Sequence, residues 1–87
     1  MKLFGGLERT DYQDVLRALG YFIDDNGYVD VRIVESDDGL VFQGRSTKRQ
    51  NLGNYVYDTF LITDVEIKEM VRQSYRRRGQ KPPTYSQ

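Results

Sequence analysis

The spacing of apolar residues changes along this chain from a helical period to a strand period, and this change limits the folds open to it. Between residues 12 and 23 the apolar residues recur at helical spacing, which predicts one buried stripe made of Tyr12, Val15, Leu16, Leu19, Phe22 and Ile23. From residue 29 to 33 apolar and polar residues alternate, as in a half-buried strand. The first clear element of the chain is therefore a helix, and a sheet follows it.

Residues at the ends of these segments set their expected bounds. Thr10 and Gln13 have the spacing of a capping box, and Asn26-Gly27 is typical of a helix end, so we expect a helix over 11–25. A turn over 35–39 separates two strands, the second covering 40–45, and a polar connection over 46–53 leads to a third strand over 54–62. Thr63 and Glu66 repeat the capping pattern at a second helix, and Gly79 follows its last arginines.

These elements predict an α+β fold in the order α-β-β-β-α. Three antiparallel strands and two helices make two layers, with both helices on one face of the sheet. With 87 residues there is room for one domain, which we place at 1–79. Residues 80–87 contain two prolines and little that is apolar, so we expect a disordered basic tail.

Strand alternation predicts which side chains leave the core. The expected core positions are Val29, Val31, Ile33, Leu40, Phe42, Val56, Phe60 and Ile62. The expected outer positions include Asp30, Arg32, Val34, Val41, Gln43, Arg45, Tyr55, Tyr57, Thr59 and Leu61. The parity of the third strand stays open, because the reverse choice buries the tyrosines instead.

Composition excludes several classes of chemistry. The chain has no cysteine and no histidine, which removes disulfides, ordinary zinc, iron–sulfur or haem ligation, and imidazole or thiol catalysis. Asp24 to Asp30 resembles part of a calcium loop, but the end positions would be Phe22 and Ile33 in place of carboxylates. Asp37-Asp38 is better explained as a turn than as an acid–base pair. We therefore expect a non-catalytic protein without metal or cofactor.

Charge is distributed unevenly, with opposite signs in the two parts of the chain. Residues 1–66 hold seven basic and twelve acidic side chains, whereas residues 67–87 hold six basic and one acidic. A basic end can engage phosphates, so one hypothesis is nucleic-acid binding through Arg76, Arg77, Arg78 and Lys81, with help from Arg45, Lys48 and Arg49. The alternative is that these cations only satisfy the end of a helix.

The order of elements resembles that of double-stranded RNA-binding domains over most of the chain. Those domains carry lysines at the start of their second helix, where this chain has Asp64, Val65 and Glu66. The resemblance is therefore one of topology, and these residues do not imply RNA binding.

The leading hypothesis is a protein-interaction module that docks a protein partner or forms a homodimer through the uncovered face of its sheet. The expected contact residues are Arg32, Val34, Val41, Gln43, Tyr55, Tyr57 and Leu61. Tyrosine and arginine are enriched in such interfaces, and an uncovered apolar face usually marks one. No apolar run approaches a membrane span and no secretory signal is evident, so we expect a cytoplasmic protein.

Overall fold

The computed structural model describes residues 11–48 and 57–83 of the chain. Its elements follow the order α1 (Tyr12–Asn26), β1 (Tyr28–Ser36), β2 (Gly39–Ser46), β3 (Tyr57–Thr63) and α2 (Asp64–Arg77). The predicted α+β class and the α-β-β-β-α order are confirmed.

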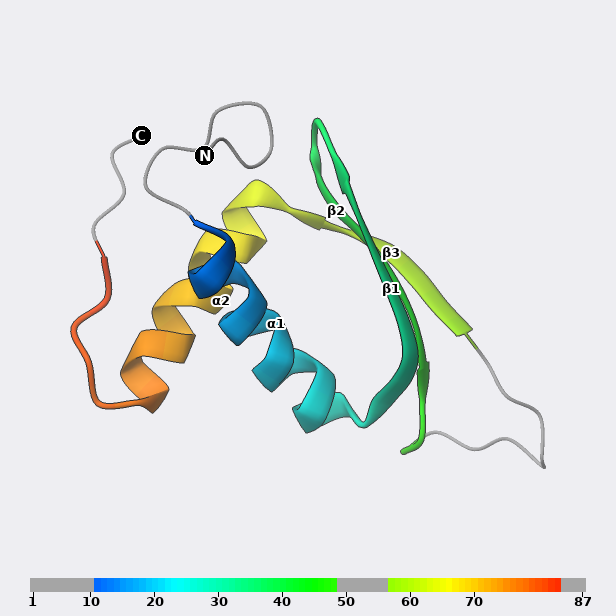
Figure 1. The fold of residues 1–87 in the computed structure, drawn as a ribbon, viewed down its shortest axis with the longest axis horizontal. Coiled ribbons are helices and arrows are strands. Elements are labelled where there is room, and N and C mark those ends of the chain that lie inside the picture. Colours follow the sequence, from blue (N-terminus) through cyan, green and yellow to red (C-terminus); the bar gives the residue numbers. More distant parts are fainter. Residues whose placement is uncertain (1–10, 49–56, 84–87) are drawn as a thin grey trace.

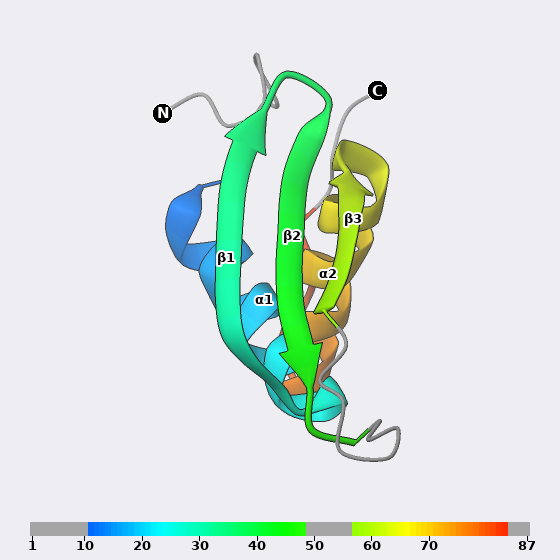
Figure 2. The same ribbon diagram turned by 90° about the vertical axis from the view of Figure 1, so that its right-hand side faces the viewer.

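The three strands form one antiparallel sheet with β2 in the centre. Both helices lie on one face of this sheet, side by side, and the described residues leave the other face open (Figures 1 and 2). The two-layer arrangement predicted from the sequence is therefore confirmed. Residues 80–83 follow α2 in irregular structure, and 84–87 lie outside the described residues, so the disordered tail stays a prediction.

The core lies between the two layers and centres on Phe42, which is fully buried on β2. Phe60 stacks on its ring at a centroid distance of 5.1 Å, and Phe22 and Tyr28 meet it edge-on at 5.4 and 5.0 Å. The hydroxyl of Tyr28 donates a hydrogen bond of 2.6 Å to Asp58. Around this aromatic cluster lie buried aliphatic side chains from both helices and two strands: Val15, Ala18, Leu19, Leu40, Ile62, Ile67 and Val71.

The aromatic cluster shows which alternate side chains of β3 point into the core. Ile62 is buried and Phe60 packs toward Phe42, while Tyr57 and Leu61 point outward, which confirms the favoured parity. Phe60 stays partly exposed because β3 is an edge strand. Val56 lies outside the described residues.

A bulge in β1 corrects one prediction about the core. The register between β1 and β2 shifts between Val29 and Arg32, and Asp30 has a φ of 54°. The extra residue of a bulge resets the alternation. Tyr28 is therefore buried, and Val29, expected in the core, is exposed.

The first helix departs from expectation at two positions. Its N-cap is Asp11, whose carboxylate accepts a 2.8 Å hydrogen bond from the Asp14 amide, so the predicted Thr10 capping box is wrong. Thr10 itself lies outside the described residues. Leu16, expected on the buried stripe, is 60% exposed because it lies at the margin of the surface that α1 packs against the sheet.

The other predicted helix ends are confirmed. Gly27 closes α1 with a φ of 65°. Gly79, with a φ of 72°, closes α2 in a Schellman motif, in which the amides of Gly79 and Gln80 donate to the carbonyls of Arg76 and Tyr75.

A capping box at Thr63 and Glu66 starts α2 and makes part of the stability depend on pH. The Thr63 amide and hydroxyl donate to the Glu66 carboxylate at 3.1 and 2.9 Å, and the Glu66 amide donates back to the hydroxyl at 3.2 Å. These hydrogen bonds, that of the amide most strongly, hold the pKa of Glu66 below its ordinary value of 4.5.

A lowered pKa contributes stability above the unfolded value, and that contribution is lost as the pH falls through the folded value. As the pH decreases from about 4.5, the free energy of unfolding of the wild type should therefore decrease. We expect a less steep decrease in Glu66→Gln. Glutamine keeps the capping geometry without a titrating group. Urea unfolding between about pH 7 and pH 2.5 measures both curves. Parallel curves would contradict the assignment.

Candidate interaction surface

The open face of the sheet carries a row of apolar side chains that crosses all three strands. Val34 pairs with Val41, and Val41 pairs with Leu61, so the three residues lie side by side on β1, β2 and β3. Their exposed fractions are 61%, 37% and 43%. Neither α1 nor α2 covers this face, as Figure 2 shows from the side opposite the helices. We call these three residues the apolar row.

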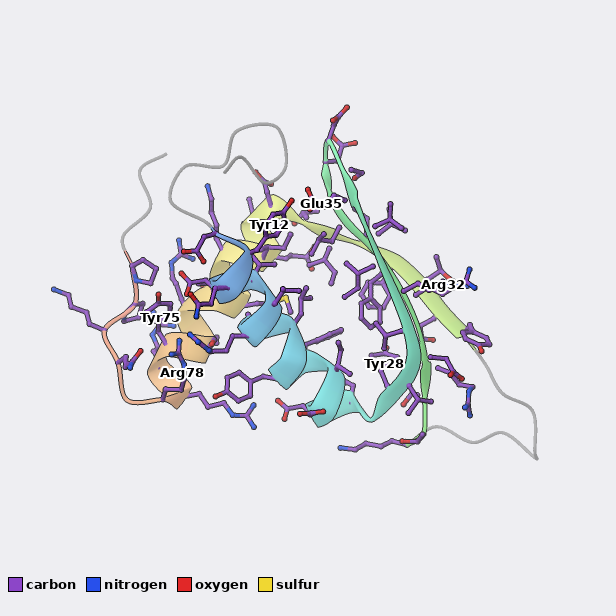
Figure 3. All side chains as sticks on the ribbon, in the orientation of Figure 1. Tyr12, Tyr28, Arg32, Glu35, Tyr75 and Arg78 are labelled. Carbon is purple, nitrogen blue, oxygen red and sulfur yellow. The ribbon has the colours of Figure 1, made fainter. Side chains whose placement is uncertain are left out.

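The next residues along the strands are polar. Arg32 pairs with Gln43 and Gln43 with Thr59, which places a polar row beside the apolar one. Figure 3 shows Arg32 pointing away from the helices. Among residues 11–48 and 57–83 Arg32 takes part in no ion pair. The apolar row is therefore bordered by a cation that another molecule can reach.

The far end of the face holds an ion pair and a tyrosine. Arg45 pairs with Tyr57 in the register and donates to the Asp30 carboxylate at 3.0 and 3.2 Å. Tyr57 is about half exposed, at 49%. Of the seven residues that the sequence proposed for this face, six lie on it as expected, and Tyr55 is outside the described residues. Their part in binding stays a prediction.

The three consecutive arginines lie at the end of α2, and each interacts with other side chains or backbone groups of the same domain. Arg76 is 3.6 Å from Glu69. Arg77 donates to both oxygens of Asp25 at 2.8 and 3.2 Å, and its guanidinium stacks on Tyr21. This pairing lowers the pKa of Asp25 and raises that of Arg77.

Arg78 and the remaining predicted cations are placed differently. Arg78 stacks on Tyr75 and donates to the Ser74 carbonyl at 3.2 Å (Figure 3). Lys48 donates to the backbone carbonyl of Asp25, so Lys48 and Arg77 share Asp25 as a hydrogen-bond partner at the end of α1. Lys81 is exposed, and Arg49 lies outside the described residues. A phosphate bound at Arg77 would have to compete with Asp25.

The structure also joins polar residues that the sequence did not connect. The Tyr75 hydroxyl donates to Asp14 at 2.9 Å, which ties α2 to α1 and raises the pKa of Tyr75. Tyr12 lies beside Glu35, and the hydrogen bond between them raises the pKa of Tyr12 (Figure 3). These partners are 61 and 23 positions apart, and no local motif links them.

Two small grooves flank α1. One, of about 220 Å³, lies between the helices, and the Asp25–Arg77 ion pair closes one side of it. Ser74 also lines it, with a buried hydroxyl that has no hydrogen-bond partner among the described residues. The other, of about 170 Å³, lies between α1 and the β1–β2 hairpin and includes Leu16 and Glu35. Both are mainly apolar and smaller than the sites that usually hold a small-molecule ligand.

Comparison of the chain with protein-family models, with curated proteins and with solved structures found no match. Within the part that the structure describes, no group of three or more acidic, histidine or cysteine side chains is placed to hold a metal ion. Neither α1 nor α2 is long and apolar enough to span a bilayer.

Proposed function

We propose that this chain is a non-catalytic interaction module that associates with a second copy of itself through the open face of its sheet. The observation that carries the proposal is the apolar row, because three large apolar side chains lie together on a face that neither α1 nor α2 covers (Figure 2). Scattered exposed apolar residues are ordinary in monomers, but a contiguous uncovered group usually marks a contact surface.

The size of the chain favours a second copy as partner. A domain of this length buries only about 60–65% of its extended surface, and natural domains near this size often gain stability from a partner subunit. The open face carries Arg32 and lies next to a turn with two carboxylates, Asp37 and Asp38. A surface that holds both charges can be complementary to itself, as a two-fold interface requires.

The extent of the face indicates a weak association. Three strands about 4.8 Å apart and up to nine residues long cover roughly 450 Å² on each copy. The area buried by both copies is then about 900 Å², below the 1,200 Å² at which specific stable interfaces begin. We therefore expect a dissociation constant of about 10 µM or weaker.

Sedimentation equilibrium of the purified chain between about 10 µM and 1 mM tests this proposal. We expect the wild-type mass to rise with concentration and Val34→Glu to stay monomeric, because association would then bury a charge in the apolar contact. The control is Val65→Glu, which changes a valine of similar exposure, 65% against 61%, in the helix layer. A wild-type chain that stays monomeric throughout, or a control that dissociates equally, would overturn the proposal.

Nucleic-acid binding is the alternative, supported by two cations, Lys48 and Arg77, that both bind Asp25 at one end of α1. Fluorescence anisotropy with short single- and double-stranded DNA and RNA at about 50 and 200 mM salt detects it. Salt-sensitive binding that weakens when Arg76, Arg77 and Arg78 are all changed to glutamine would favour this alternative over self-association. We expect no such binding by the intact chain, because Asp25 already holds Arg77.

A further inference from the structure

We infer that the two copies pack face to face about a two-fold axis that runs across the strands at the apolar row, which sets Arg32 of each copy against the Asp37–Asp38 turn of the other. This inference rests on the proposed self-association and specifies its geometry. It adds the acidic turn, which the sequence identifies only as a turn, to the contact surface.

The geometry follows from the positions of three residues on β1. Arg32 and Ser36 each lie two positions from Val34, on opposite sides of it, at about 6.6 Å along the strand. A two-fold axis across the strands at Val34 reverses the strand direction of the second copy. Arg32 of one copy then lies opposite Ser36 of the other, and the exposed Asp37 and Asp38 come next.

The charged side chains of Arg32, Asp37 and Asp38 are available to form ion pairs between the two copies. Neither Asp37 nor Asp38 has an ion pair with another described residue, and the same holds for Arg32. The turn itself is held by Ser36, whose hydroxyl donates to the Gly39 carbonyl at 3.1 Å. The two carboxylates are therefore not needed for the turn and can meet a cation from outside.

Other arrangements of the same faces are less favourable. A two-fold axis along the strands would place Arg32 over Thr59 of the other copy, where no carboxylate balances its charge. An axis one row further, at Gln43, would place the apolar row of each copy over the Asp30–Arg45 ion pair of the other. That arrangement would remove the ion pair from water without a compensating partner.

Charge reversal tests the arrangement. We expect Arg32→Glu alone, and Asp37→Lys with Asp38→Lys in a second variant, each to weaken the dimer about tenfold, because like charges then meet at two symmetric contacts. An equal mixture of the two variants should form a mixed dimer about as tightly as the wild type. In that mixed dimer a glutamate faces the lysines at one contact and an arginine faces the aspartates at the other.

Fluorescence energy transfer between differently labelled variants measures the mixed dimer, and sedimentation equilibrium measures each variant alone. Arg17→Glu, a charge reversal in the helix layer, is the control, and circular dichroism verifies that every variant is folded. Suppose the wild type dimerises and Val34→Glu does not, but the mixture binds no better than its components. The two-fold arrangement would then be wrong while self-association stands. A monomeric wild type would overturn both.

Discussion

Replacing Phe42 with alanine should lower the free energy of unfolding by about 3–5 kcal/mol, the usual cost of removing a buried phenylalanine. The Phe42 ring is fully buried and contacts three other aromatic rings, from α1, β1 and β3, so its loss opens a cavity where the two layers meet. Domains of this length have about 4–13 kcal/mol of stability in total. The variant should therefore lose a large share of the total stability of the fold.

The matched control for Phe42→Ala is Val41→Ala, at the next position on the same strand. Val41 points to the open face and is 37% exposed, so we expect a loss of about 1 kcal/mol or less. Urea unfolding followed by circular dichroism measures both variants. Equal losses would contradict the assignment of the core to the helix side of the sheet.

The position of Phe42 was predictable because the strand alternation of β2 is unambiguous. The same alternation predicted that Val34, Val41 and Leu61 point outward, but not that they align in one row. The turn expected over 35–39 is shorter in the structure, because β1 continues to Ser36 and β2 begins at Gly39, and this short turn fixes Val34 opposite Val41. The bulge at Asp30 was not predictable, because it depends on how β1 pairs with β2 and no local sequence pattern indicates it. Val29 was misplaced for this reason.

Two further features depended on contacts between distant residues. Both faces of β3 carry large apolar side chains, so its parity could not be decided until Phe60 was seen stacked on Phe42. The arginine run was recognisable in the sequence, but its partner was not. Asp25 lies 52 positions before Arg77, and only the packing of α1 beside α2 brings the two together.

Replacing Gly39 with alanine is expected to cost about 2–4 kcal/mol, from backbone strain together with a lost strand hydrogen bond. Gly39 starts β2 and pairs with Ser36 on one side and Thr63 on the other. Its φ is 148°, which L-residues rarely adopt, and a Cβ there would lie 2.1 Å from the Ile62 carbonyl oxygen. That oxygen belongs to the backbone of β3, so the strand itself would have to move.

Gly79→Ala separates the two causes of this loss. Gly79 also has a positive φ, 72°, but an added Cβ would meet nothing within 4 Å, so only the conformational cost of about 1 kcal/mol remains. Urea unfolding should therefore show a clearly larger loss for Gly39→Ala, and equal losses would mean that β3 does not approach Gly39 this closely. Because Leu61 adjoins Ile62 on the displaced strand, Gly39→Ala should also misalign the apolar row and weaken self-association in the fraction that stays folded.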